Sequence, residues 1–191
     1  ITIARYYTPS GRCIQRPYSG DYNAYYEDLN RDEESMFKID SSVFVDSLKF
    51  QTIGGRAVYG GGGISPDVFV PYDTTGSTVY LSSLEWSGVF NQFVFDWCKN
   101  SKQFIETSWQ SFNAYDQKFE SLDLLPKLVE YAEREFKINP MNTSELNSSS
   151  ERILRRLKSE IARQFYNEDG FYKVYNRDDA DVKAALQSFG E

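Results

Sequence analysis

The sequence of 191 residues contains no histidine. Without an imidazole, the chain cannot build a Ser-His-Asp or Cys-His nucleophile system, a histidine zinc site or a histidine general base. Most hydrolase mechanisms are therefore excluded, unless they use lysine, carboxylates or residues that lie outside this chain.

Cysteine is nearly as scarce, and Cys13 and Cys98 lie far apart in the chain. Two such residues form neither a dense disulfide framework nor a metal-ligand spacing. We expect two separate buried thiols. A bridge between them in an oxidising compartment is the alternative that the sequence leaves open.

Long apolar runs and an excess of positive charge are also missing. The sequence has no run of roughly eighteen apolar residues, so it predicts no membrane span. The net charge of −7 argues against nucleic-acid binding, which depends on clustered Lys and Arg. Arg152, Arg155, Arg156 and Lys158 alternate with apolar residues at helical spacing, which predicts a solvated helix face.

Aromatic residues are abundant, with 14 Tyr and 14 Phe in a chain long enough to bury a core. The amino-terminal part has the alternation of β structure. Residues 1–7 predict a strand, "TPSG" predicts a turn and residues 12–15 resume the extended path. Farther on, "LKFQT" and "RAVYG" predict a hairpin that turns at Gly54 and Gly55, and "DVFVP" predicts another strand.

Two segments of this part invite a ligand-binding interpretation that the residues do not support. Residues 60–63 are four glycines, but no Lys-Ser/Thr follows as in a phosphate loop, so we expect a sharp backbone bend there. Residues 17–47 are Tyr-rich and acidic, with Asp28, Asn30 and Asp32 spaced as at the start of a calcium loop. Glu33 stands where that loop needs Gly and Ile39 where it needs Glu, so we expect an exposed excursion with some short helix.

The remainder of the chain has helical periodicity. One amphipathic helix is predicted between residues 79 and 105, where Trp86, Val89, Phe90, Phe93, Val94, Trp97 and Cys98 mark the apolar stripe of a core-facing helix. A second helix is expected from Pro126 to about Asn139, and a third across residues 153–165. Gly170 is expected to turn the chain before a short last helix in "DDADVKAALQSF". The predicted fold class is α+β, with amino-terminal β-hairpins and strands (1–75) followed by a predominantly helical region (76–191).

Two stretches, "TIARYYTPSGRCIQ" and the later "GGISPDVFVP", each contain a short motif of apolar, Pro and Gly positions. The positions are Thr2, Ala4, Tyr6, Pro9, Gly11, Ile14 and Gln15, then Gly63, Ile64, Pro66 and Asp67. In that order, they resemble the C-terminal processing (tail-specific) serine peptidase family. The resemblance covers about the first third of the chain. It implies that residues 1–75 are the carboxy-terminal strands of an incomplete protease core, with an inserted hairpin or loop at about 16–59.

The resemblance also implies where the chemistry lies. In that family, the nucleophilic serine and the lysine base precede the strand at which this chain begins, and Ile1 in place of Met gives the start the look of a cut. Because a desolvated lysine replaces histidine as the base, no metal or organic cofactor is expected. We therefore assign no catalytic, cofactor-binding or metal-binding residue in this chain and expect the isolated fragment to be inactive.

Three residues here could be mistaken for catalytic groups. Ser10 lies in an ordinary Pro-Ser-Gly turn, and Cys13 has no histidine partner. Asp67 follows Pro66 at the entry to a predicted strand, where a carboxylate usually fixes the turn. We interpret all three as structural.

Two functions remain open. The first is the carboxy-terminal portion of a serine endopeptidase that cleaves proteins near their C termini, in which this portion completes the core and serves packing or assembly. Such an enzyme would act on protein or peptide substrates through upstream domains, commonly including a PDZ domain, in the bacterial cell envelope or periplasm. The second is an autonomous, non-catalytic interaction or scaffold module. Strands that lack their core partners also favour self-association or strand exchange between copies.

Overall fold

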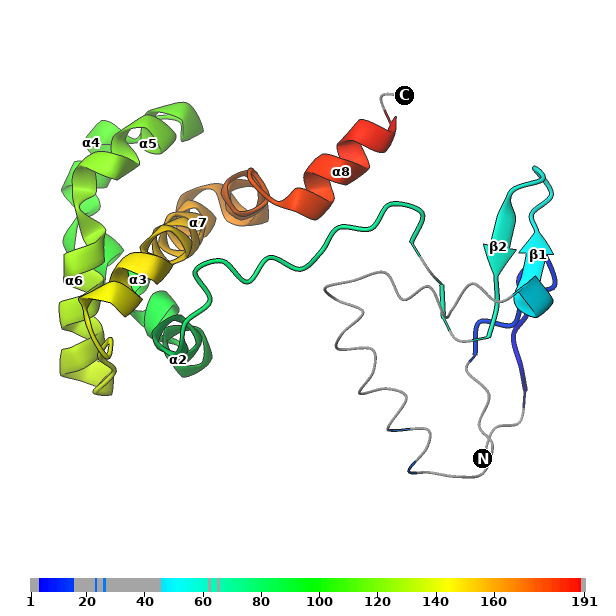
Figure 1. Cartoon of the computed structure of the whole chain (residues 1–191). Helices are drawn as coiled ribbons and strands as arrows, with labels where there is room; N and C mark the ends of the chain where they lie inside the picture. The colour runs from blue at the N-terminus through cyan, green and yellow to red at the C-terminus, as the bar shows by residue number, and fades with distance from the viewer. Residues whose placement is uncertain are drawn as a thin grey trace. The chain divides into compact units, whose positions relative to one another are not determined.

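A computed structural model describes residues 4–15, 23, 26, 46–61, 63, 64 and 66–189. The chain divides into two compact units, Ile1–Asp73 and Thr74–Glu191, whereas the sequence analysis set the division after residue 75. Figure 1 shows the two strands in the first unit and the long helices in the second. This arrangement confirms the predicted α+β fold class. Most of the acidic excursion at 17–47, including the rejected calcium loop, lies outside the described residues.

The described part of the first unit contains two tight antiparallel hairpins. In one, Tyr7 pairs with Cys13 in a single β-bridge around the predicted Pro-Ser-Gly turn. In the other, β1 (Lys49–Gln51) pairs with β2 (Ala57–Tyr59), as predicted. A short 3₁₀ turn, η2 (Asp46–Leu48), leads into β1. Gly55 supplies the positive φ of 79° that the hairpin turn needs.

The strand predicted at residues 67–71 is not formed, and the chain there is irregular. A strand is defined by its ladder partner, and no described segment of this chain pairs with these residues. The alternation in "DVFVP" was therefore a wrong sign of pairing within the described part of this chain.

The second unit is helical. Its elements, in chain order, are α2 (Val79–Ser87), α3 (Val89–Asn100), α4 (Lys102–Ser108), α5 (Phe112–Lys118), η3 (Phe119–Leu122), α6 (Leu124–Tyr131), η4 (Ala132–Phe136), α7 (Thr143–Tyr175) and α8 (Ala180–Phe189). None of the helices in the described part of the chain has both the length and the apolar character of a membrane span. The last helix confirms the prediction for "DDADVKAALQSF".

The single helix predicted at residues 79–105 is wrong, because the segment forms three helices. Gly88, in the left-handed conformation with φ of 79°, ends α2 and begins α3. Ser101 leaves the helical region at φ −106° and ψ 14° and ends α3. Only one non-helical residue separates neighbouring helices, so the apolar residues keep their three- and four-residue spacing across each break. The break also turns Trp86 to solvent, with 91% of its surface exposed, although the stripe placed it in the core.

The helix predicted from Pro126 is confirmed with adjusted ends. It begins at Leu124, with Pro126 in its first turn, and continues as the π-helical turn η4. Lys137, at φ 60°, ends it two residues before the predicted Asn139. Before it, α5 and η3 fill a stretch for which the sequence analysis predicted no element. Ser111 starts α5, because its hydroxyl accepts the Ala114 N–H at 3.2 Å.

The third predicted helix is part of α7, which is longer than expected at both ends. Asn142 caps its first turn by accepting the Glu145 N–H at 2.9 Å. Glu145 then accepts two N–H groups, from Met141 at 2.6 Å and from Tyr80 at 3.0 Å. The same carboxylate therefore satisfies the starts of both α7 and α2.

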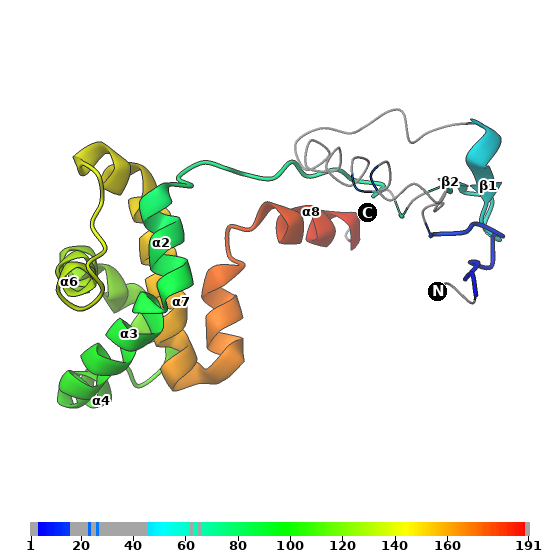
Figure 2. The same cartoon turned by 90° about the horizontal axis from the view of Figure 1, so that it is seen from below.

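Gly170 does not turn the chain, contrary to the sequence prediction. The bend of α7 lies at Tyr166 and Asn167, where Asn167 has φ 54° and ψ −158°. After the bend, α7 turns back along its own first arm (Figure 2). Gly170 is buried there, and a Cβ on it would lie 2.8 Å from the Ala162 carbonyl oxygen and 2.5 Å from the Tyr166 Cβ. Gly170 therefore allows the backbone on the two sides of the bend to pack closely, where a side chain would not fit.

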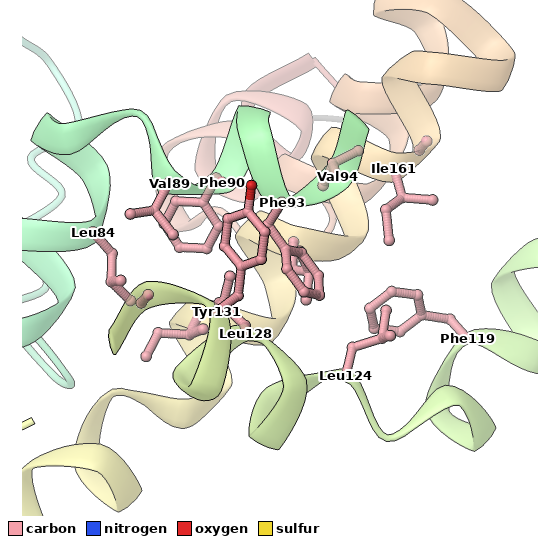
Figure 3. Close-up of a cluster of buried hydrophobic side chains, with 14 of the residues drawn as sticks. Leu84, Val89, Phe90, Phe93, Val94, Phe119, Leu124, Leu128, Tyr131 and Ile161 are labelled. Carbon is pink, nitrogen blue, oxygen red and sulfur yellow. The ribbon is translucent and has the colours of Figure 1, made fainter. Parts of the chain in front are cut away.

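The core belongs to the second unit, and α7 packs against α2, α3, α5 and α6 within it. Figure 3 shows the centre of this cluster, where side chains from several helices meet. The buried members labelled there are Leu84, Val89, Phe90, Phe93, Val94, Phe119, Leu124, Leu128, Tyr131 and Ile161. Because these side chains come from most of the helices, the second unit has the single contiguous core of an independent domain.

Candidate functional site

The two motifs that carry the family resemblance meet in the first unit. The Gly63 N–H donates to the Ile14 carbonyl at 2.8 Å, across the segment that separates the motifs in sequence. The Arg12 guanidinium donates to the Tyr59 carbonyl at 3.1 Å beside this junction. We call residues 4–15 and 57–64 the motif junction. The end of the predicted insertion therefore returns to where it started.

Gly60 allows the close approach at the motif junction. A Cβ at this position would lie 3.1 Å from the Arg12 Cγ and 3.1 Å from the Phe50 ring. Both distances are tighter than ordinary carbon contacts, so the Arg12 side chain and the Phe50 ring would have to shift by a few tenths of an ångström to admit a side chain here. The sequence analysis expected the glycine run to bend the backbone. Gly61 at φ 102° and Gly63 at φ 91° fit this expectation.

The residues that could be mistaken for catalytic groups lie around this junction without a catalytic arrangement. Among the described residues, the Ser10 hydroxyl has a single hydrogen-bond partner, the Thr8 hydroxyl at 2.9 Å. The Cys13 Sγ lies 3.9 Å from the Gln15 carbonyl oxygen. Asp67 forms an exposed ion pair with Arg56 at 2.8 Å. In the described part of the unit, no basic side chain contacts the Ser10 hydroxyl or the Cys13 thiol.

The described residues of the first unit form almost no core. Val58 is the one buried hydrophobic residue among its described residues, and Ile53 has 94% of its surface exposed. The other exposed large hydrophobic residues described in this unit are Tyr6, Tyr7, Ile14, Tyr26, Leu48, Ile64, Val68 and Tyr72. A two-stranded hairpin with this little burial is at best marginally stable by itself.

The second unit contains a polar pocket of about 380 Å³ between α3 and the segment formed by α6 and η4. At its centre, the Tyr131 hydroxyl donates to the Asp96 Oδ2 at 2.6 Å, from a residue that is 7% exposed. Figure 3 shows Tyr131 reaching from α6 toward α3. Burial, followed by the bond to Asp96, raises the pKa of Tyr131 to about 12.

Aromatic and charged groups surround this pair. The remaining lining residues are Gln92, Phe93, Trp97 and Asn100 from α3 and Lys127, Glu130, Arg134 and Glu135 from α6 and η4. Phe93 meets the Tyr131 ring edge-on at 5.4 Å between centroids, and the Arg134 guanidinium lies 5.4 Å from the same ring. The sequence analysis missed this site. Its one local signal was a polar stripe on α3, with Gln92, Asp96 and Asn100 four residues apart beside the apolar one.

The basic residues of α7 do not form the solvated face predicted from their spacing. The Lys158 Nζ lies 2.9 Å from an Asp116 oxygen, with 11% of its side chain exposed. Arg156 and Arg163 contact the two oxygens of Glu160, at 2.8 Å and 2.6 Å, and Glu160 is 2% exposed. Glu160 is therefore a buried carboxylate whose charge is compensated by two partly exposed arginines.

The two cysteines are free thiols and both are half-buried. Cys98 packs against the aromatic core, and burial raises its pKa to about 12, so it has little thiolate character. Nowhere in the described ranges do three or more of the residue types that bind metals come together.

Comparisons with known proteins add one likeness, in the helical unit. The model of a family of unknown function, DUF8443, matches residues 80–167, from the start of α2 to the bend of α7. This range contains every residue of the polar pocket and none of the motif junction. No curated protein and no solved structure matches the chain.

Proposed function

We propose that this chain is the carboxy-terminal portion of a tail-specific serine endopeptidase, which cleaves proteins near their C termini. The observation that carries the proposal is the bond between Ile14 and Gly63. It joins two motifs that resemble the family, although most of the sequence between them is a predicted insertion. A chance match of two short patterns would not require them to meet in space.

The exposed apolar surface of the first unit supports the same proposal. Ile53, Ile64 and Val68 are exposed, and the described residues of this unit bury almost no hydrophobic side chain. Such strands gain stability when they complete a sheet and a core supplied by another segment. In the proposed enzyme, that segment is the upstream part of the protease domain, and residues 67–71 find their strand partner there.

The proposed reaction is acyl transfer. An upstream serine hydroxyl attacks the peptide carbonyl, an upstream lysine takes its proton, and the amine product leaves. Water then attacks the acyl-enzyme and releases the second product and the serine. The present chain supplies the frame that holds the upstream strands, while the helical unit packs on the core or mediates assembly. The proposed location is the bacterial cell envelope, in the periplasm.

A second candidate is an autonomous, non-catalytic interaction or scaffold module. The observation that favours it is the complete core of the second unit, which needs no other segment to fold. In this case, the motif junction would be a strand-and-turn structure that also occurs in proteins without peptidase activity.

The sequence encoded immediately upstream of Ile1 separates the two candidates. The peptidase proposal requires a serine-bearing segment followed by a lysine-bearing strand, and their absence would overturn it. Where they are present, the upstream segment and this chain are produced together and cleavage of an unstructured carboxy-terminal tail peptide is measured. Turnover is expected from the assembled protein and not from this chain alone.

A matched pair of variants then tests the motif junction. Gly63→Pro removes the N–H that binds Ile14, whereas Gly55→Pro removes an N–H at the remote hairpin turn that binds Thr52 at 2.9 Å. Both replace a glycine of positive φ, so their local strain is similar. Gly63→Pro is expected to reduce turnover at least tenfold relative to Gly55→Pro. Equal activity of the two would show that the motif junction does not serve the catalytic core.

A further inference from the structure

The polar pocket of the second unit contains one carboxylate without a cationic partner. Asp96 accepts the Tyr131 hydroxyl at Oδ2, and no described residue bonds to Oδ1. The two glutamates of the pocket share one guanidinium. Arg134 binds Glu135 at 2.7 Å and lies 3.9 Å from Glu130.

The remaining cation of the pocket is also engaged elsewhere. The Lys127 Nζ donates to the Leu122 carbonyl at 3.1 Å, at the carboxyl end of η3. The pocket therefore keeps a net negative charge at Asp96. An anionic ligand would lie beside this carboxylate and would have to take Arg134 or Lys127 from its present partner, so a cation is the better occupant.

The walls of the pocket suit a cation with an apolar stem. Phe93, Trp97 and Tyr131 line it, and aromatic rings attract cations through their electron-rich faces. Gln92 and Asn100 lie one turn of α3 to either side of Asp96 and offer amide oxygens. A volume of about 380 Å³ lies within the range of small-ligand sites.

We propose that this pocket binds a primary ammonium group on a short alkyl chain, such as a lysine side chain, with Asp96 as its counter-ion. An ammonium group is compact and can bind a single carboxylate oxygen, and Oδ1 of Asp96 is the oxygen that Tyr131 does not occupy. A guanidinium achieves its best geometry with both oxygens of a carboxylate, and Oδ2 is already occupied by Tyr131. The site therefore favours lysine over arginine.

The π-helical turn η4 contributes two of the lining residues of the pocket. It directly follows Tyr131 and carries Arg134 and Glu135 at the rim. Turns of this kind place an extra residue in a helix and are frequent at functional sites. The proposal is independent of the peptidase proposal, because every residue it uses lies in the helical unit.

The test uses the whole chain labelled with ¹⁵N and follows the indole N–H signal of Trp97 during titration. The probes are Nα-acetyl-lysine methylamide, its norleucine counterpart, which lacks the ammonium, and n-butylamine. The lysine probe is expected to shift the signal with saturation and the norleucine probe to bind at least tenfold more weakly. Saturation by n-butylamine would show that the ammonium and its chain suffice, whereas saturation by the lysine probe alone would assign the site to peptides.

Two variants connect the signal to Asp96. Asp96→Asn keeps the shape of the side chain and an acceptor for Tyr131 but loses the charge, so affinity for the lysine probe is expected to fall at least fivefold. Asp169→Asn makes the same exchange at an exposed residue that does not line the pocket, and it is expected to retain binding. Equal binding of the lysine and norleucine probes to the unaltered protein, or saturation by neither, would overturn the proposal without any variant.

Discussion

Replacing Gly170 by Ala should open the bend of α7 or compress its two arms. Gly170 lies in the second arm (residues 168–175), which packs back on the first (143–165). The added Cβ would lie 2.8 Å from the Ala162 carbonyl oxygen and 2.5 Å from the Tyr166 Cβ, closer than real Cβ atoms approach. Neither neighbour is the end of a flexible side chain, so the backbone itself must move.

The size of the effect follows from two routes. If the arms stay together, overpacking costs about 1–3 kcal/mol, and contacts this short indicate the upper end. If the second arm moves away, it exposes Phe171 and Val174, which are both buried, at roughly 3–6 kcal/mol for the pair. Alanine recovers about 1 kcal/mol through its higher helix propensity. The cheaper route leaves a net loss of about 2 kcal/mol.

Thermal unfolding followed by circular dichroism at 222 nm measures this loss. For a helical unit of this size, about 2 kcal/mol corresponds to a fall in Tm of roughly 8 °C. Asp169→Ala is the matched control, because it changes an exposed residue on the same arm and should stay within about 0.5 kcal/mol of the unaltered protein. A Gly170→Ala variant as stable as this control would refute the packing role of Gly170.

Two further predictions follow from the ionisable groups. Burial alone would raise the pKa of the Asp116 carboxyl, but hydrogen bonds and charges from Arg177 and Lys158 outweigh burial and hold the pKa below 3.8. The ionised carboxylate therefore stabilises the folded protein above pH 3.8, and this stabilisation is lost as the pH falls through the lowered pKa. Asp116→Asn should therefore lower the free energy of unfolding by about 1–2 kcal/mol at pH 7 in urea titrations, and a difference that persists undiminished at pH 2 would contradict this account. Because burial raises the pKa of Cys98 to about 12, iodoacetamide at pH 8 should alkylate it only after denaturation, as read by peptide mass; rapid alkylation of the native protein would mean that Cys98 is open to solvent.

Sequence patterns predicted the elements that depend on local residues. The hairpin of "LKFQT" and "RAVYG" and the last helix are formed as expected, because a turn glycine or an apolar period specifies each one. The sequence analysis missed the helix breaks at Gly88 and Ser101, because a single non-helical residue hardly changes the spacing of the apolar residues between 79 and 105. Gly170 was misread for a related reason: glycine permits both a turn and a close helix contact, and only the surrounding fold decides between them.

The polar pocket could not be predicted, because its central pair joins residues that are 35 positions apart. Asp96 alone is an ordinary polar residue of an amphipathic helix, and Tyr131 alone is an ordinary core aromatic. Their pairing depends on how α3 packs against α6. The strand predicted at residues 67–71 failed in the opposite way, because its pattern presupposes a partner that the described part of this chain does not supply.

The bond between Ile14 and Gly63 also bears on how this protein can change over evolutionary time. It joins the residues on either side of the segment that the sequence analysis interprets as an insertion, and so fixes the distance that such a segment must span. Lengthening a flexible loop between fixed ends is inexpensive, at about 0.6 kcal/mol for each doubling. If this segment is an insertion, changes in its length are therefore expected to leave the positions of the two motifs the same.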